Sequence, residues 1–121
     1  KGLLDNLTEN FQVKKEYILD AITAVSGSGP AYFFYLAENI IQAAKGLGLS
    51  LTQSEKLVKK TLLAAAYLQD QDKFPLLISK IASKKGTTEA ALRVFEEKKF
   101  SDVVKRAVHA AFRRAKELAN E

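Results

Sequence analysis

The 121-residue chain lacks cysteine, and this absence removes several kinds of chemistry. Without thiols it can form neither a disulfide framework nor a thiolate metal site, which is compatible with a reducing cytoplasm. His109 is the only histidine, so a zinc site built on imidazole ligands is not expected. No apolar run approaches the roughly 20 residues that span a bilayer. We therefore expect a cytoplasmic protein with neither a metal site nor a membrane segment.

Methionine is absent as well, and the sequence begins at Lys1. A complete translated reading frame would carry an initiator methionine, so we expect a domain taken from a longer protein. The residues from Gly2 to Leu7 include a charged break and lack the long apolar stretch of a signal peptide. We interpret residues 1–13, with a short extended stretch at residues 11–13, as the remainder of a preceding domain. Residues 14–121 are then the domain itself.

The formal net charge is +5 at pH 7, which raises nucleic acid as a possible partner. Binding of that kind needs cations gathered in one footprint, whereas here they are spread over most of the chain, as on solvated helix faces. The doublets are Lys14-Lys15, Lys59-Lys60, Lys84-Lys85, Lys98-Lys99, Lys105-Arg106 and Arg113-Arg114. A basic, all-helical interaction module that binds nucleic acid or an acidic protein stays open as the alternative function.

Apolar residues recur at the three- and four-residue spacing of one-sided helices along most of the chain. No stretch alternates for long enough to form a strand, so the predicted fold is all-α. The stripe on the helix expected from about Ala31 to Leu47 is too wide for one neighbour, which favours burial against a partner chain. The other helices are expected at about 14–25, 53–69, 75–81, 88–98 and 101–118, the last with a near-heptad seam at Val104, Val108, Ala111, Ala115 and Leu118.

Short polar residues predict where several of these helices begin and end. Thr52 and Glu55 have the spacing of a capping box, in which each side chain accepts a hydrogen bond from a backbone N–H group of the first turn. The other expected signals are Thr87 or Thr88 and Ser101 as caps, and Gly46 and Gly48 as a left-handed helix exit.

Two glycine-containing loops open onto apolar helices and carry most of the chemical information. They are Asp20-Ala-Ile-Thr-Ala-Val-Ser-Gly-Ser-Gly-Pro-Ala-Tyr32 and Ile81-Ala-Ser-Lys-Lys-Gly-Thr-Thr-Glu-Ala-Ala91. Small hydroxyl residues and glycine at a helix N-terminus leave backbone N–H groups free and positively polarised, as a carboxylate or phosphate requires. We therefore expect one wall of a small-anion site. Each loop is also consistent with a simple helix corner, in which glycine supplies a positive φ and serine or threonine a cap.

Neither loop is a dinucleotide fingerprint or a P-loop, because no strand precedes it. Outside the loops, His109 is interpreted as a packing or surface residue rather than a base. Tyr17, Tyr32, Tyr35 and Tyr67 are interpreted as core or interface aromatics with a polar tip.

Both loops, in this order and spacing, resemble the signature stretches of the C-terminal domain of the pyrroline-5-carboxylate reductase family. The resemblance extends from about Lys14 to Leu118 and includes Phe95-Glu96 after the second loop. It implies a helical dimerisation domain of the 6-phosphogluconate-dehydrogenase C-terminal-like type, interlocked with its twin as a homodimer, often within a larger ring. It also implies reduction of 1-pyrroline-5-carboxylate to L-proline with NADPH or NADH, in proline biosynthesis. In that family an N-terminal Rossmann domain holds the dinucleotide, so residues 1–13 would be its tail and this domain alone would be inactive.

By the same resemblance, Ser83 and the backbone of Gly86, Thr87 and Thr88 bind the substrate carboxylate. The Thr88 hydroxyl then lies near the ring nitrogen and is the candidate catalytic residue, orienting the atom that is protonated. The family's Pro-Gly after the loop serine is replaced here by Lys84-Lys85, and lysine restricts the backbone where glycine frees it. The geometry of the loop between Ser83 and Gly86 therefore stays open.

A third interpretation is the helical half of another β-hydroxyacid-type dehydrogenase. It predicts a catalytic lysine on an apolar helix that faces the cofactor, and the sequence offers no convincing candidate. The choice between NADH and NADPH depends on contacts in a dinucleotide-binding domain, so these residues leave it open.

Overall fold

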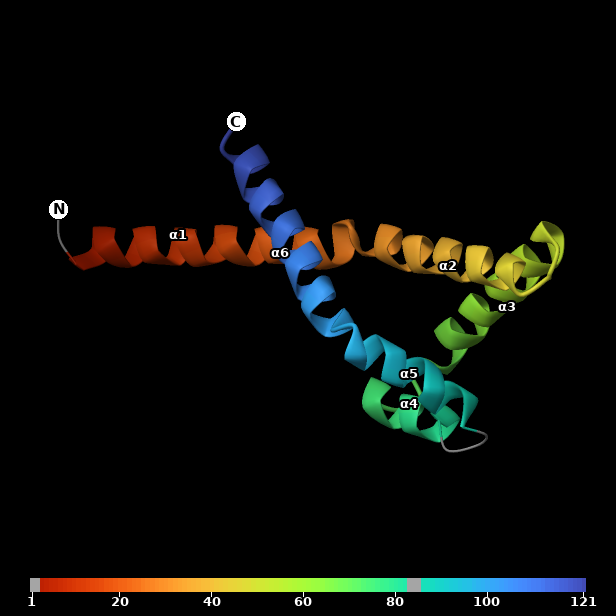
Figure 1. The fold of residues 1–121 in the computed structure, drawn as a ribbon. Coiled ribbons are helices and arrows are strands. Elements are labelled where there is room, and N and C mark those ends of the chain that lie inside the picture. Colours follow the sequence, from red (N-terminus) through yellow and green to blue (C-terminus); the bar gives the residue numbers. More distant parts are fainter. Residues whose placement is uncertain (1–2, 83–85) are drawn as a thin grey trace. The chain divides into compact units, whose positions relative to one another are not determined.

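The structure, a computed structural model, describes residues 3–82 and 86–121, all of them in helices or the short turns between helices. No strand occurs in these two stretches, which confirms the predicted all-α fold. In chain order (Figure 1) the elements are α1 (Leu3–Ile22), a π-helical turn η1 (Thr23–Gly27), α2 (Gly29–Gly46), α3 (Leu51–Leu68), α4 (Phe74–Ala82), α5 (Thr87–Glu97) and α6 (Phe100–Ala119).

The chain divides into two compact units, of which the first consists of Lys1–Tyr32 and Ser101–Glu121. Within it, the Tyr17 ring of α1 meets the Phe112 ring of α6 edge-on, with centroids 4.9 Å apart. The His109 ring also lies near Phe112, with ring centroids 5.9 Å apart. The middle of the predicted α6 seam, from Val108 to Ala115, includes the half-buried residues of this helix, whereas Val104 and Leu118 at its ends are exposed.

The second unit consists of Phe33–Phe100 and contains most of α2 together with α3, α4 and α5. The Phe95 and Phe100 rings pack 5.1 Å apart across the turn that ends α5, where Lys99 has a left-handed φ of 57°. Asp72 accepts a hydrogen bond from the Lys73 N–H at 2.9 Å and pairs with Lys80 at 3.4 Å, which ties the turn before α4 to the body of that helix. Pro75 lies in the first turn of α4, as the sequence predicts.

The N-terminal part differs from its prediction. An extended stretch was expected at residues 11–13, but α1 runs through it without interruption from Leu3 to Ile22. The sequence between these residues contains no proline or glycine, and Gln12 hydrogen-bonds Glu16 one turn later at 3.4 Å. The helix therefore continues past residue 13, where the sequence analysis placed the boundary between a preceding domain and this one. No change of secondary structure occurs at that residue.

The start of α3 corrects a second prediction. The cap is Ser50 rather than Thr52: the Ser50 hydroxyl accepts from the Gln53 N–H at 3.1 Å, and the Gln53 side chain accepts from the Ser50 N–H at 3.0 Å. Thr52 lies inside the helix and is exposed. A four-residue capping box was correctly predicted here, but it was placed two residues too late. The reason is that Ser-Leu-Thr-Gln and Thr-Gln-Ser-Glu both satisfy the capping-box pattern.

Two smaller boundary predictions also change. The left-handed exit after α2 is at Gly48, with a φ of 103°, whereas Gly46 is still the last helical residue. Helix α6 begins at Phe100, so Ser101 lies inside it and is not its cap.

The capping box gives the first testable prediction. Ser50→Ala should lower the free energy of unfolding by about 1 kcal/mol, because it leaves first-turn N–H groups without a partner. Thr52→Ala should change it by less than about 0.5 kcal/mol, since alanine suits an exposed helical position. Urea unfolding at one fixed protein concentration measures both. A larger loss of unfolding free energy in Thr52→Ala than in Ser50→Ala would show that Thr52 is the cap, as the sequence predicted.

The two glycines after α2 form a matched pair for a second prediction. An added Cβ meets no atom within 4 Å at either residue, so only backbone conformation separates them. Gly46→Ala should raise the free energy of unfolding by about 0.5–1 kcal/mol, because alanine favours the helix. Gly48→Ala should lower it by about 1–2 kcal/mol, because a Cβ is disfavoured at positive φ. Shifts of equal sign in thermal unfolding would contradict the assigned helix exit.

Candidate functional site

The first glycine-containing loop folds as a π-helical joint between α1 and α2. The Ser28 N–H donates to the Thr23 carbonyl at 3.0 Å, the Ala31 N–H donates to the Ser28 carbonyl at 3.0 Å, and Pro30 has no N–H. Neither Gly27 nor Gly29 has a positive φ, so the corner conformation expected for these glycines is wrong. Two backbone donors of this loop, the Ser28 and Ala31 N–H groups, are thus used within the loop itself.

Three hydroxyl groups complete this joint. The Thr23 and Ser26 side chains donate to the carbonyls of Leu19 and Ile22, each at 3.0 Å, and the Tyr32 hydroxyl donates to the Ala24 carbonyl at 2.6 Å. From the sequence, Tyr32 was expected to be a core or interface aromatic, and its bond to Ala24 was not foreseen. The feature of the sequence that could have indicated this bond is the position of Tyr32, soon after Gly-Pro and eight residues after Ala24.

The second loop leads into α5, and its described part begins at Gly86. Gly86 is the residue before the helix, with a left-handed φ of 78°, and α5 begins at Thr87. The expectation that Thr87 or Thr88 caps the helix is therefore wrong. Ser83 and Lys84-Lys85 lie outside the described residues, so the structure brings together three of the four predicted substrate-binding residues, Gly86, Thr87 and Thr88, in one turn.

The first turn of α5 has backbone donors that no described side chain caps. Gly86 has no side chain to accept from them, and the first turn closes with the Ala90 N–H donating to the Gly86 carbonyl at 3.1 Å. Thr87 is exposed and Thr88 is half-buried, so one hydroxyl faces solvent and the other lies partly under cover. A helix start with uncapped N–H groups and a nearby hydroxyl is suited to a small carboxylate.

Charge near this turn acts in both directions. The N-terminus of α5 has a partial positive charge from its aligned peptide dipoles, which attracts an anion. Glu89 lies in the same first turn and its charge opposes one, but the side chain is exposed, so solvent and salt screen the repulsion. Because the helix dipole and the Glu89 charge oppose each other, directed N–H hydrogen bonds, rather than net charge, would hold a ligand at this turn.

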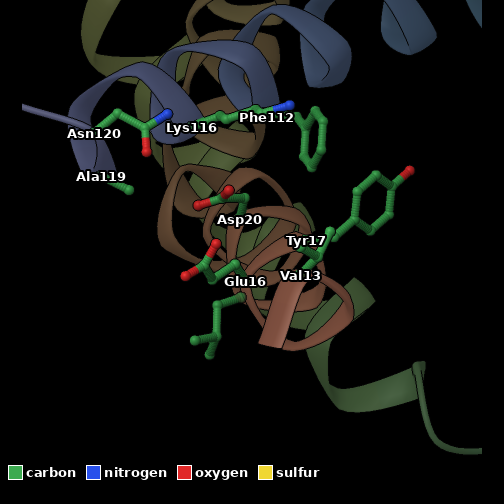
Figure 2. A pocket seen from close by; sticks show the side chains of 9 residues that line it. Val13, Glu16, Tyr17, Asp20, Phe112, Lys116, Ala119 and Asn120 are labelled. Atoms are coloured by element: carbon green, nitrogen blue, oxygen red, sulfur yellow. The ribbon is translucent and has the colours of Figure 1, made fainter. Parts of the chain in front are cut away.

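A groove in the first unit brings together polar side chains that the sequence had not singled out. It encloses about 290 Å³ between α1 and α6 (Figure 2). Glu16 and Asp20 lie one turn apart on α1, and Lys116 and Asn120 lie one turn apart on α6. This i, i+4 spacing on both helices was visible in the sequence. Within the described residues neither carboxylate forms an ion pair with Lys116, and the groove contains no nucleophile paired with a base.

The described helices were also compared with the requirements of a metal site and of a membrane span. Within residues 3–82 and 86–121, no three histidine, aspartate or glutamate side chains are placed to hold a metal ion together. None of the helices in these stretches is both long and apolar enough to cross a membrane.

Comparisons with known proteins agree on one family. The sequence model described as pyrroline-5-carboxylate reductase dimerisation matches residues 16–118. The pyrroline-5-carboxylate reductase of Pseudomonas aeruginosa is 42% identical over 105 residues, which cover 85% of this chain and 38% of that protein. Pyrroline-5-carboxylate reductase 2 of Bacillus subtilis is 31% identical over 123 residues, which cover 100% of this chain and 44% of that protein.

Solved structures give the same result. The pyrroline carboxylate reductase of Plasmodium falciparum with NADP bound superposes with a TM-score of 0.77 at 32% identity, over 84% of this chain and 39% of that one. A pyrroline-5-carboxylate reductase from Coxiella burnetii superposes with a TM-score of 0.76 at 36% identity, over 84% and 38%. The chain thus spans well under half the length of these relatives. With its all-α fold and both signature loops, it belongs to the pyrroline-5-carboxylate reductase dimerisation family.

Proposed function

We propose that this chain is the dimerising and substrate-binding part of a reductase that converts 1-pyrroline-5-carboxylate to L-proline with NAD(P)H. The observation that carries the proposal is the uncapped first turn of α5, at the position of the family's second signature loop. The names of its relatives support the reaction. The basic interaction module considered from charge gains no support from the family match.

The substrate carboxylate is the group that the start of α5 recognises in this proposal. A carboxylate oxygen accepts readily from two or three converging N–H groups, and the bonds are stronger because the acceptor is charged. Gly86, Thr87 and Thr88 supply these donors, and Ser83 adds a hydroxyl from the part of the loop outside the described residues. The left-handed Gly86 brings the backbone in without a Cβ, so a ligand can approach the helix end closely.

Thr88 orients the ring nitrogen of the bound imino acid. Reduction adds a hydride to the ring carbon and a proton to the nitrogen, and the C=N double bond becomes single. Hydride addition is easier when the nitrogen carries its proton, so a hydroxyl that hydrogen-bonds this atom favours the reactive form. Threonine is a very weak acid, and water is therefore the proton source in this proposal.

The nicotinamide cofactor supplies the hydride when it is bound. Within the described residues there is no strand followed by a glycine-rich turn and a helix, which is the unit that holds such dinucleotides. We therefore assign NADPH or NADH mainly to a part of the enzyme outside these 121 residues. The NADP in the related Plasmodium falciparum structure supports a nicotinamide cofactor for the complete protein.

A second copy of the chain covers the apolar helices in this proposal, as an interlocked homodimer that can build a larger oligomer. Among residues 10, 12–82 and 86–121, only Ala24, Ile41 and Val58 are buried hydrophobic side chains. Large apolar residues on α2 and α3 remain open, including Phe33 at 63% and Tyr67 at 80% exposure. A domain of this size normally buries about two thirds of its unfolded surface, and a partner with the same stripes supplies the missing contacts. A cytoplasmic location remains part of the proposal.

Thr88 provides the test of the substrate site. In the full-length enzyme, Thr88→Ala should lower kcat/KM about ten- to hundredfold, because a hydrogen bond to a charged or polar ligand contributes about 1.5–3 kcal/mol. Thr88→Ser keeps the hydroxyl and should recover most of that loss. Thr52→Ala is the matched control, since Thr52 is an exposed helical residue away from this loop. Equal losses of kcat/KM in Thr88→Ala and Thr88→Ser would show that the Thr88 hydroxyl has no part in the mechanism.

Sedimentation tests the self-association. At micromolar concentration the 121-residue chain should be at least a dimer, and it should show no dinucleotide-dependent turnover. Phe33→Glu places a charge on the exposed apolar stripe of α2 and should weaken the dimer by about a hundredfold or more, because burying a carboxylate without a partner is costly. Lys60→Glu, at an exposed cation of α3, should leave association within about threefold. A stable monomer of the unaltered chain would contradict the proposed partner.

A further inference from the structure

The joint between α1 and α2 contains a hydrogen bond that the proposed substrate site does not use. In an α-helix the Ser28 N–H would donate to the Ala24 carbonyl, four residues earlier. It donates instead to the Thr23 carbonyl at 3.0 Å, five residues earlier, which is the pattern of a π-helix. The Ala24 carbonyl thus loses its helical partner, in a residue that is only 1% exposed.

Tyr32 supplies the missing donor from the other side of the joint. Its hydroxyl lies 2.6 Å from the Ala24 carbonyl oxygen, and the residue is half-buried in the first turn of α2. A buried carbonyl without a partner is strongly unfavourable, so the π-helical turn and this tyrosine are needed together. The bond fixes the first turn of α2 against the end of α1.

No other described side chain links the two helix ends by a hydrogen bond. The Thr23 and Ser26 hydroxyls bond to carbonyls of the preceding turn, which bends the end of α1 without reaching α2. Gly29 has no atom within 4 Å of an added Cβ, so close packing does not fix the joint at this residue either. Among the described side chains, the Tyr32 hydroxyl therefore holds the first turn of α2 to the end of α1.

We propose that Tyr32 is a positioning residue for the reduction, which it serves by holding the first turn of α2 to the end of α1. This rests on the proposed function, in which a dinucleotide-binding domain precedes α1 and the imino acid is held at α5. Hydride transfer requires close alignment of donor and acceptor atoms, and a misplacement of about 1 Å can lower the rate about a hundredfold. Loss of the bond widens the range of angles at the joint and leaves the carboxylate donors of α5 unchanged.

The test is Tyr32→Phe in the full-length enzyme, which removes one oxygen atom. We expect kcat to fall about three- to tenfold while KM for the imino acid stays within about twofold. The primary isotope effect on kcat with deuterated dinucleotide should rise, because hydride transfer limits the rate more strongly. Thr52→Ala is the control, because Thr52 is an exposed residue inside α3 and takes no part in the joint. All three quantities should stay unchanged in this variant.

Hydrogen exchange in the same full-length proteins gives a measurement that needs no activity. The Ser28 and Ala31 amides should exchange about tenfold faster in Tyr32→Phe than in the unaltered protein or Thr52→Ala, because local opening of the joint becomes easier. Faster exchange with unchanged kcat and isotope effect would overturn the positioning role and leave a stabilising contact. Unchanged exchange rates of the Ser28 and Ala31 amides would show that the Tyr32 hydrogen bond does not hold the joint. An unaltered enzyme without reductase activity would overturn the proposed function and the positioning role with it, while the exchange rates would still decide whether Tyr32 holds the joint.

Discussion

The constraint on which the rest of this structure depends is a shortage of burial within one chain. The helices have apolar stripes wide enough for more than one neighbour, yet among residues 10, 12–82 and 86–121 only three hydrophobic side chains are buried. Helix propensity alone stabilises isolated helices of this length only marginally in water, and packing supplies most of the stability of protein helices. The fold is therefore an arrangement of helices whose apolar faces need cover from outside the chain, in keeping with the dimerisation family to which it belongs.

Helix ends determine where chemistry can occur in such an arrangement. Every helix leaves several N–H and carbonyl groups without helical partners, and this chain satisfies them in different ways. Ser50 and Gln53 cap α3 reciprocally, and the Tyr32 hydroxyl serves the carbonyl released by the π-helical turn. The start of α5 differs, because the left-handed Gly86 offers no side chain to its N–H groups. The start of α5, whose first-turn donors no described side chain caps, is also the predicted substrate loop.

The two signature loops therefore have different physical roles despite their similar composition. Both combine glycine with serine or threonine, and sequence reasoning assigned both to an anion site. The first loop uses two of its N–H groups in a π-helical joint, whereas no described side chain caps the helix start in the second. Composition does not separate these outcomes, because the same residues suit a positive φ, a cap or a π-helical turn. Which one forms depends on whether a partner such as Tyr32 lies within reach of the released carbonyl.

The sequence by itself determined the helical class, the approximate extent of five of the six α-helices, and the family, since apolar spacing and two long motifs are local and specific. It also located Gly86, Thr87 and Thr88 as one cluster. Only the three-dimensional structure decided the register of the α3 cap, the unbroken α1 and the left-handed residue before α5. The physical reason is that two overlapping motifs can satisfy one capping pattern, and that a helix without a breaker continues through a stretch that reads as a boundary. The Tyr32 bond joins residues eight apart across a π-helical turn, and no pattern of residue types specifies that geometry until the backbone has folded.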